Sequence, residues 1–239
     1  MISVDCVTYC VIYSVEVILK RFVRNLFFFA LIFTFGQSSF AQAETVKPRV
    51  LLVGDSQSIG PFGRRLDQLL RQDFTVETHA VVGSILKWWR TGQVGMNGLL
   101  SISENGKITE TKTGPTPNLE NLLNQFRPDW IILQFGGNYR GFSAAEIRAD
   151  IETSLKHVEA MGARCFFVSN PASRFPVEGL PEALEAAVKS RCEFFRSDLV
   201  TEYPSMGGDG YHYSFKAGIP VARAWAKQVY TRFLERLAR

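Results

Sequence analysis

The chain has 239 residues, of which 46% are hydrophobic and 21% are charged, a composition typical of a globular protein that buries a full core. Its formal net charge is only +4, and the sequence contains no basic tract and no nucleic-acid-binding motif. A nucleic-acid partner is therefore not expected, and the length suits one α/β domain.

The first 43 residues have the pattern of an export signal. A basic segment at 20–24 precedes the apolar run LFFFALIFTF at 26–35, and small residues then lead to an Ala-Gln-Ala cleavage site at 41–43. The apolar run is too short for a comfortable membrane span. We therefore expect residues 1–43 to be a signal peptide that is removed after export.

Two features of this region leave alternatives open. A second apolar run at 7–19 also suits an uncleaved membrane anchor, and the extension before residue 20 suits a start site placed too far upstream. In either case we expect residues 44–239 to form one domain in the periplasm or the extracellular medium. The membrane is then a partner only through an uncleaved signal segment.

Strand-like and helix-like segments alternate from residue 49 onward. Short apolar runs predict buried strands, and apolar residues at helical spacing predict helices. The predicted strands are 49–54, 75–82, 130–135, 165–169 and 192–195. The predicted helices are 58–71, 119–126, 144–161, 181–189 and 215–237. This alternation is typical of a parallel sheet with helices on both faces.

Residues 99–113 depart from this alternation. Their pattern alternates around Asn105-Gly106, a dipeptide that strongly favours a hairpin turn. We predict a small surface hairpin inserted in the loop after the second strand.

The sequence contains four cysteines, of which Cys6 and Cys10 would leave with the signal peptide. Cys165 and Cys192 each begin an apolar run, so two neighbouring parallel strands would bring their sulfur atoms within reach. An even number in an exported chain favours a disulfide, and two buried thiols are the alternative. Neither cysteine has an obvious activating partner nearby in sequence, so reactive-thiol chemistry is not expected.

Three stretches, 54–56, 82–84 and 136–138, follow the ends of predicted strands. Open parallel sheets bind their ligands at this edge. Ser56 lies on the turn from the first strand into a helix, where it can act as a nucleophile or simply cap the helix. No G-x-x-x-x-G-K-[ST] or G-x-G-x-x-G motif follows this strand, so a phosphate-binding loop is not predicted.

Three groups at these strand ends can donate hydrogen bonds to a developing oxyanion. They are the backbone N–H of Ser56, the backbone N–H of Gly83 and the side-chain amide of Asn138. Taken singly, each is equally well explained as a loop residue that suits the geometry of a turn.

Only one of the three histidines is placed to act as a base. His79 lies in a predicted strand and His157 in a predicted helix, where structural roles are expected. His212 lies in a glycine-rich segment before the last helix, and Asp209 precedes it by three residues, close enough to orient the imidazole. This spacing alone has little specificity, but a serine nucleophile needs such a base.

Taken together, four stretches resemble the four blocks of the SGNH (GDSL-type) hydrolases, in the family's order. They are Gly54-Asp55-Ser56, Gly83, Gly136-Gly137-Asn138 and Asp209-Gly210-Tyr211-His212. The resemblance extends over residues 49–239, and it implies a three-layer α/β/α sandwich with a flavodoxin-like parallel sheet.

The resemblance also implies the roles of individual residues. Ser56 would be the nucleophile, and His212 the general base, which Asp209 orients. Ser56, Gly83 and Asn138 would form the oxyanion hole. Two positions differ from the family pattern: Gln57 replaces a leucine beside the nucleophile, where no part in the chemistry is expected, and Tyr139 replaces an aspartate that often follows the asparagine.

The expected activity is that of an exported serine esterase acting on short O-acyl esters such as O-acetyl groups, with an acylated small molecule or cell-wall glycan as substrate. Trp88 and Trp89 would stack on a sugar ring and Arg90 would bind an acidic group; the alternative is that the tryptophans pack under the hairpin. No cofactor or metal is expected, because the sequence has no His/Cys cluster with metal-ligand spacing.

Three other functions share these sequence features. An acyltransferase would pass the acyl group to a glycan hydroxyl, a lipid esterase or thioesterase would act on another acyl donor, and a non-catalytic module would only bind the cell envelope. The sequence does not indicate the oligomeric state.

Overall fold

The computed structural model describes residues 47–189 and 191–238. The predicted signal peptide, with Cys6 and Cys10, lies outside these residues. Within the described part, no helix combines the length and the apolar character needed to cross a membrane.

A seven-stranded sheet in the order β5-β4-β2-β1-β7-β8-β9 forms the centre of the fold. The last five strands in this order run parallel to one another. They are β2 (Thr75–Val81), β1 (Arg49–Gly54), β7 (Trp130–Gln134), β8 (Arg164–Val168) and β9 (Glu193–Phe195). Each lies within one residue of its predicted bounds, so the parallel sheet is confirmed.

The hairpin between residues 99 and 113 is also confirmed, but it extends the main sheet and is not a separate surface feature. Its strands are β4 (Leu99–Ile102) and β5 (Ile108–Thr111), and β4 pairs antiparallel with β2. A two-stranded sheet of β3 (Val94–Gly95) and β6 (Gly114–Pro115), which the sequence did not predict, flanks this hairpin along the chain.

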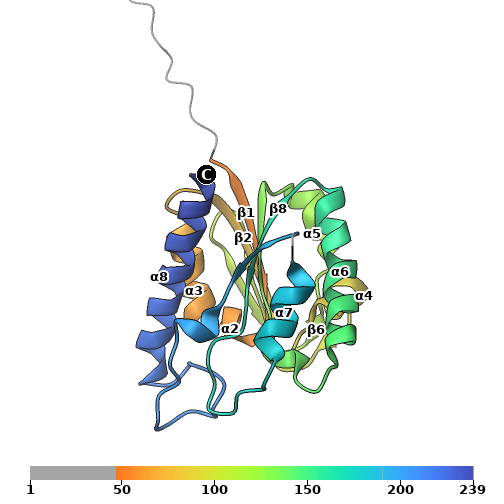
Figure 1. The fold of residues 1–239 in the computed structure, drawn as a ribbon. Coiled ribbons are helices and arrows are strands. Elements are labelled where there is room, and N and C mark those ends of the chain that lie inside the picture. The colour runs from red at the N-terminus through yellow and green to blue at the C-terminus, as the bar shows by residue number, and fades with distance from the viewer. Residues whose placement is uncertain (1–46, 190, 239) are drawn as a thin grey trace, which may run out of the picture. The chain divides into compact units, whose positions relative to one another are not determined.

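Helices cover both faces of the sheet, so the three-layer α/β/α sandwich is confirmed (Figure 1). One face carries α3 (Pro61–Leu70) and α8 (Gly218–Leu237). The other carries α4 (Leu86–Thr91), α5 (Leu119–Phe126), α6 (Ala144–Ala160) and α7 (Leu180–Val188). The predicted helix 58–71 is divided into α2 (Ser56–Ile59) and α3, with Gly60 between them and Pro61 opening α3.

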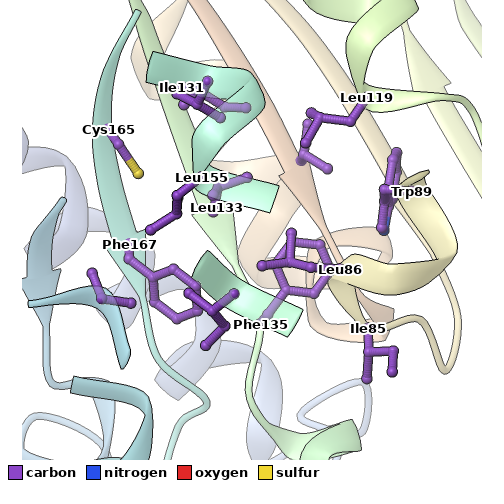
Figure 2. Close-up of a cluster of buried hydrophobic side chains, with 14 of the residues drawn as sticks. Ile85, Leu86, Trp89, Leu119, Ile131, Leu133, Phe135, Leu155, Cys165 and Phe167 are labelled. Atoms are coloured by element: carbon purple, nitrogen blue, oxygen red, sulfur yellow. The ribbon is translucent and has the colours of Figure 1, made fainter. Parts of the chain in front are cut away.

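Consecutive residues of the central strands enter different halves of the core. In β1, Val50 and Leu52 pack beneath α3 and α8, whereas Leu51 and Val53 pack beneath the helices of the opposite face. Figure 2 shows part of this second cluster, with side chains from β7, β8, α4, α5 and α6 pointing toward one another. Because both faces of β1 are buried, its carboxyl end has a fixed position in the molecule.

The predicted pairing of Cys165 with Cys192 is present as a disulfide, with the two Cα atoms 4.6 Å apart. Cys165 lies near the start of β8, and Cys192 directly precedes β9. The bond therefore lies at the amino ends of the parallel strands, whereas the candidate site stretches follow their carboxyl ends.

Candidate active site

Ser56 begins the short helix α2, two residues after β1 ends. Asp55 lies between them as the helix cap, and its Oδ1 atom accepts the backbone N–H of Gln57 at 2.9 Å. The cap is therefore provided by Asp55. The alternative interpretation of Ser56 as the capping residue does not apply, and its hydroxyl is available for another role.

Gly54 allows this turn to pack closely against the neighbouring strand. A Cβ atom on Gly54 would lie 2.1 Å from Ser58 Oγ. The Ser58 hydroxyl is buried and donates a hydrogen bond of 2.8 Å to Oε1 of Gln134, the last residue of β7. Glycine is thus required at the end of β1 for the serine turn to join the edge of the sheet.

Asp55 is a buried carboxylate directly beneath the candidate nucleophile, with only 2% of its surface exposed. Burial raises its pKa to about 6, because the loss of hydration outweighs the backbone N–H of Gln57, the charge of His212 and the Gln134 side chain, all of which favour the charged form.

His212 brings the glycine-rich C-terminal segment back to this turn. Its Nε2 atom lies 2.8 Å from Ser56 Oγ, and its Nδ1 atom lies 2.6 Å from Asp209 Oδ2. The second carboxylate oxygen of Asp209 accepts the backbone N–H of His212 at 2.8 Å. A serine, a histidine and an aspartate therefore form one continuous line of hydrogen bonds, which is the arrangement that activates a hydroxyl nucleophile.

The charge of Asp209 is maintained by these contacts. Partial burial raises the pKa of this carboxyl group, but hydrogen bonds from the His212 ring and from the backbone N–H groups of His212 and Tyr211 outweigh that effect and lower it to about 2. Asp209 is thus ionised at neutral pH and can stabilise a positive charge on the imidazole.

Hydrogen bonds to backbone atoms hold the segment that carries His212. The Tyr203 hydroxyl donates to the His212 carbonyl at 3.1 Å and accepts the N–H of Gly210 at 2.9 Å. The Arg174 backbone N–H donates to the Gly210 carbonyl at 2.8 Å. Its guanidinium Nη2 also donates to three carbonyls of the same segment, those of Pro204, Ser205 and Gly207.

Gln57 connects the two halves of the site, a structural role that its position beside Ser56 did not predict. Its side chain lines the same cavity as Ser56, and its Nε2 atom donates to the Tyr211 carbonyl at 2.8 Å. Glutamine can make this bond and leucine cannot. The departure from the family pattern thus has a structural purpose.

Asn138 lies in a 3-10 turn (Gly137–Tyr139) after β7 and lines the cavity with Ser56. Its Nδ2 group donates to the Ser84 carbonyl at 3.0 Å, which ties it to the loop after β2. Gly83 directly precedes Ser84, with a positive φ of 78°, but it is not among the residues that line the cavity. The structure therefore brings Asn138 to Ser56, with Gly83 in the adjoining loop.

Tyr139 stands where the family often has aspartate, and it supports Asn138 in another way. Its ring is buried, and its hydroxyl accepts the backbone N–H of Leu86 at 3.2 Å and donates to Asp150 Oδ2 at 2.7 Å. The turn that carries Asn138 is thereby fixed to both α4 and α6.

The tryptophan prediction is wrong for Trp89. This side chain is 0% exposed, belongs to the core cluster of Figure 2, and donates through Nε1 to Ser84 Oγ at 3.1 Å. Arg90 is engaged with Asp150 at 2.5 Å and with Ser154 at 3.0 Å, so its guanidinium is not free for an acidic ligand. Trp88 is half-buried beside Gly83 and packs against the core, and none of the three lines the cavity.

A cavity of about 360 Å³ opens over the serine and the histidine. It is lined by polar, aromatic and glycine residues, with no aliphatic side chain among the described residues that form it: Asp55, Ser56, Gln57, Gly137, Asn138, Arg140, Asn170, Tyr211 and His212. Of these, the sequence analysis missed Arg140, Asn170 and Tyr211 as candidate ligand contacts. They come from three separate loops. Asn170 directly follows the predicted strand 165–169, so the rule that ligands bind after the carboxyl ends of strands could have found it, whereas no local pattern marks Arg140.

Asn170 follows β8, lines the cavity and has one buried polar atom without a partner in the described part of the chain. Its Oδ1 atom is buried and has no hydrogen-bond partner among the described residues. Gly136, with φ of 155°, makes room for it, because a Cβ atom there would lie 2.3 Å from that oxygen. This oxygen is enclosed by protein atoms, and Asn170 contributes to the cavity wall through the rest of its surface.

No protein-family model matches the sequence, and no curated protein matches it. Several solved structures are similar. The psychrotrophic esterase EstA from Pseudoalteromonas sp. is 16% identical over 79% of this chain and all of its own, with a TM-score of 0.53. A peptidoglycan O-acetylesterase is 12% identical over 82% of this chain and 93% of its own, with a TM-score of 0.52. TesA is 16% identical over 76% and 97%, with a TM-score of 0.50.

At these identities the likeness is one of fold. The similar structures agree with the mostly parallel sheet between two helical layers. The chain therefore has the three-layer fold of the SGNH-type hydrolases.

Proposed function

We propose that this protein is a serine esterase that removes short O-acyl groups, such as acetyl, from a polar substrate outside the cytoplasm. The observation that carries this proposal is the line of hydrogen bonds from Asp209 through His212 to Ser56, which ends in an open cavity. Similar folds among esterases, including EstA and the peptidoglycan O-acetylesterase, support the same reaction class.

The reaction proceeds through an acyl-enzyme. His212 Nε2 accepts the proton from Ser56 Oγ as this oxygen attacks the ester carbonyl, and Asp209 stabilises the resulting imidazolium. The imidazolium then protonates the leaving alcohol. Water attacks the acyl-serine with His212 again as the base, and the acid is released.

Negative charge develops on the carbonyl oxygen in both steps. Ser56 and Asn138 line the same cavity, and the loop that holds Gly83 adjoins Asn138 through Ser84. We assign the oxyanion hole to Ser56, Asn138 and Gly83. The loss of one such donor typically lowers turnover about 10²- to 10³-fold.

The cavity favours a short acyl group on a polar substrate over a lipid. Its lining offers amide, guanidinium and phenol groups and no aliphatic side chain among the described residues, so a long acyl chain would gain little from burial there. Asn138, Asn170 and Arg140 in the cavity wall are polar side chains of the kind that bind sugar hydroxyl groups. We therefore infer an O-acylated glycan as the substrate class.

Two features of the chain, its predicted signal peptide and its disulfide, support export. The predicted signal peptide at 1–43 directs the chain out of the cytoplasm, and the Cys165–Cys192 disulfide is of the kind that persists in oxidising compartments. A periplasmic or extracellular esterase would meet acylated glycans of the cell wall there.

The proposal is tested by expressing the full-length sequence, purifying the exported protein and following hydrolysis of 4-nitrophenyl acetate. We expect Ser56→Ala to lower kcat at least about 10³-fold, because the remaining groups cannot supply a nucleophile. Acetate release from acetylated glycans is expected to exceed fatty-acid release from phospholipid vesicles.

Ser205→Ala is the matched control. It removes a serine hydroxyl from the exposed segment before His212, where only the backbone carbonyl is used, and should retain wild-type turnover. Equal activity of Ser56→Ala and the wild-type protein would contradict the proposal. Acyl transfer to an added glycan, without release of acid, would replace the esterase by an acyltransferase.

A further inference from the structure

An arginine that the sequence analysis did not single out forms part of the cavity wall. Arg140 follows the turn that carries Asn138, and it lines the cavity together with Tyr211, Ser56 and His212. Its Cζ atom lies 4.0 Å from the centroid of the Tyr211 ring. A cationic group is therefore positioned within the same pocket as the candidate nucleophile.

Two contacts restrict the orientation of the Arg140 guanidinium, on a side chain that is otherwise exposed. It stacks on the Tyr211 ring, and its Nη2 atom donates to the Phe175 carbonyl at 3.2 Å. The Phe175 ring in turn packs against Tyr211, with centroids 5.4 Å apart. Planar stacking and one hydrogen bond limit the rotamers of the arginine, so binding a ligand costs less side-chain entropy.

The charge of Arg140 is not neutralised within the described residues. No carboxylate there lies within 4.0 Å of its guanidinium, whereas Arg90 is paired with Asp150 and Arg196 with Asp198. The carboxylates of the site itself are also engaged elsewhere, since Asp209 binds His212 and Asp55 caps α2. The remaining guanidinium N–H groups are thus available for a ligand.

Tyr211 links Arg140 to the residue that acts on the alcohol portion of the ester. It directly precedes His212, the group that protonates the leaving alcohol in the proposed reaction, and Gln57 holds its carbonyl beside the serine turn. Arg140 therefore contacts the chain neighbour of the group that acts on the leaving alcohol, within the same cavity.

We propose that the alcohol portion of the substrate carries a carboxylate, which Arg140 binds. This inference rests on the proposed esterase function and narrows its substrate class to O-acylated acidic sugars or similar acidic alcohols. A planar guanidinium can donate two parallel hydrogen bonds to a carboxylate, which distinguishes such a substrate from a neutral one of the same size.

The test uses a pair of esters that differ in charge and little in shape, 3-acetoxybenzoate and 3-acetoxybenzamide. The value of kcat/KM for each is divided by its rate constant for uncatalysed hydroxide hydrolysis, and the ratio of acid to amide is compared. We expect a ratio of about five to ten for the wild-type protein at low salt, as for one partly exposed charge-assisted contact. Salt should lower it.

Arg140→Gln should bring this ratio close to one, and Arg140→Lys, which keeps the charge without the planar fork, should give an intermediate value. Arg148→Gln is the matched control, because it removes the same charge from an exposed position on α6 and should leave the wild-type ratio. A variant that folds poorly would lose activity on both esters, so its ratio remains informative.

A wild-type ratio near one, or a ratio unchanged in Arg140→Gln, would overturn the inference and leave Ser56-dependent hydrolysis intact. Loss of the esterase function would instead appear as equal activity of Ser56→Ala and wild-type protein on both esters. The two failures are therefore distinguishable.

Discussion

The two sides of the candidate site are held in place by different means. Ser56 follows β1, whose residues are buried on both faces, and the preceding Asp55 is almost completely enclosed. His212 lies in a segment, 201–217, with no helix or strand, and 42% of its side chain is exposed. The proposed nucleophile takes its position from the core of the fold, whereas the proposed base takes its position from a small number of hydrogen bonds.

This difference predicts where substitutions will act. Changes around Ser56 alter the buried core and are expected to appear in the free energy of unfolding. Changes in the segment around His212 remove contacts that are mostly exposed and are expected to appear in turnover. Three substitutions test this difference, and they follow in decreasing order of expected effect.

Asp209→Asn should have the largest effect, a decrease in kcat of roughly 10³- to 10⁴-fold on 4-nitrophenyl acetate. The amide can no longer stabilise the imidazolium and favours the wrong tautomer of His212, which Asp209 now contacts at 2.6 Å. Because 53% of the Asp209 side chain is exposed, the thermal midpoint should change little. A decrease in kcat of less than tenfold would show that the line of hydrogen bonds does not act as a catalytic unit.

Asp55→Asn should act on stability, and in a pH-dependent way. Burial raises the pKa of Asp55 from 3.8 to about 6, so the folded protein binds this proton more tightly than the unfolded chain. The resulting stabilisation is complete below pH about 4 and is lost as the pH rises through about 6. Asparagine does not titrate, so the free energy of unfolding of the variant relative to wild type should rise by about 2 kcal/mol between pH 4 and pH 7.

Urea denaturation at these two pH values measures that change. Asp209→Asn provides a comparison, because the pKa of Asp209 is lowered to about 2 and its contribution is lost only as the pH falls below about 4. Its stability difference should therefore vary little between pH 4 and pH 7. A stability difference for Asp55→Asn that does not vary with pH would refute the assigned role of burial.

Arg174→Met should have the smallest effect, a decrease in kcat of about tenfold with little change in KM. The substitution removes the side-chain bonds to three carbonyls of the segment before His212, so the imidazole would spend less time in line with Ser56. Arg148→Met, on the exposed surface of α6, should retain wild-type kcat. If Arg174→Met changes only the thermal midpoint, the arginine does not position the base.

Much of this architecture could be predicted from the sequence, because local patterns encode it. The parallel strands follow from apolar runs, and the positions of Ser56 and Asn138 follow from the rule that loops after such strands meet at one edge. The division of the predicted helix 58–71 was missed but could have been predicted, since a glycine followed by proline at 60–61 is a helix-start signal.

The error at Trp89 has a physical cause. The buried side of α4 is formed by Leu86 and Trp89 at helical spacing, together with Ile85 just before the helix. Trp89 therefore faces the core, whereas Lys87 is exposed. The stacking of Arg140 on Tyr211 was not predictable in this way. The two residues are distant in sequence and meet only because their loops return to the same end of the sheet.

The disulfide has a consequence for the last parallel strand. β9 contributes only three residues to the sheet, and it pairs with β8 alone, at an open edge. So short a ladder holds an outermost strand weakly, and the Cys165–Cys192 bond replaces the pairing that a longer strand would have supplied. Formation of the disulfide thus anchors β9 at the edge of the sheet. In a chain retained in a thiol-rich compartment, backbone pairing and packing alone would hold this strand.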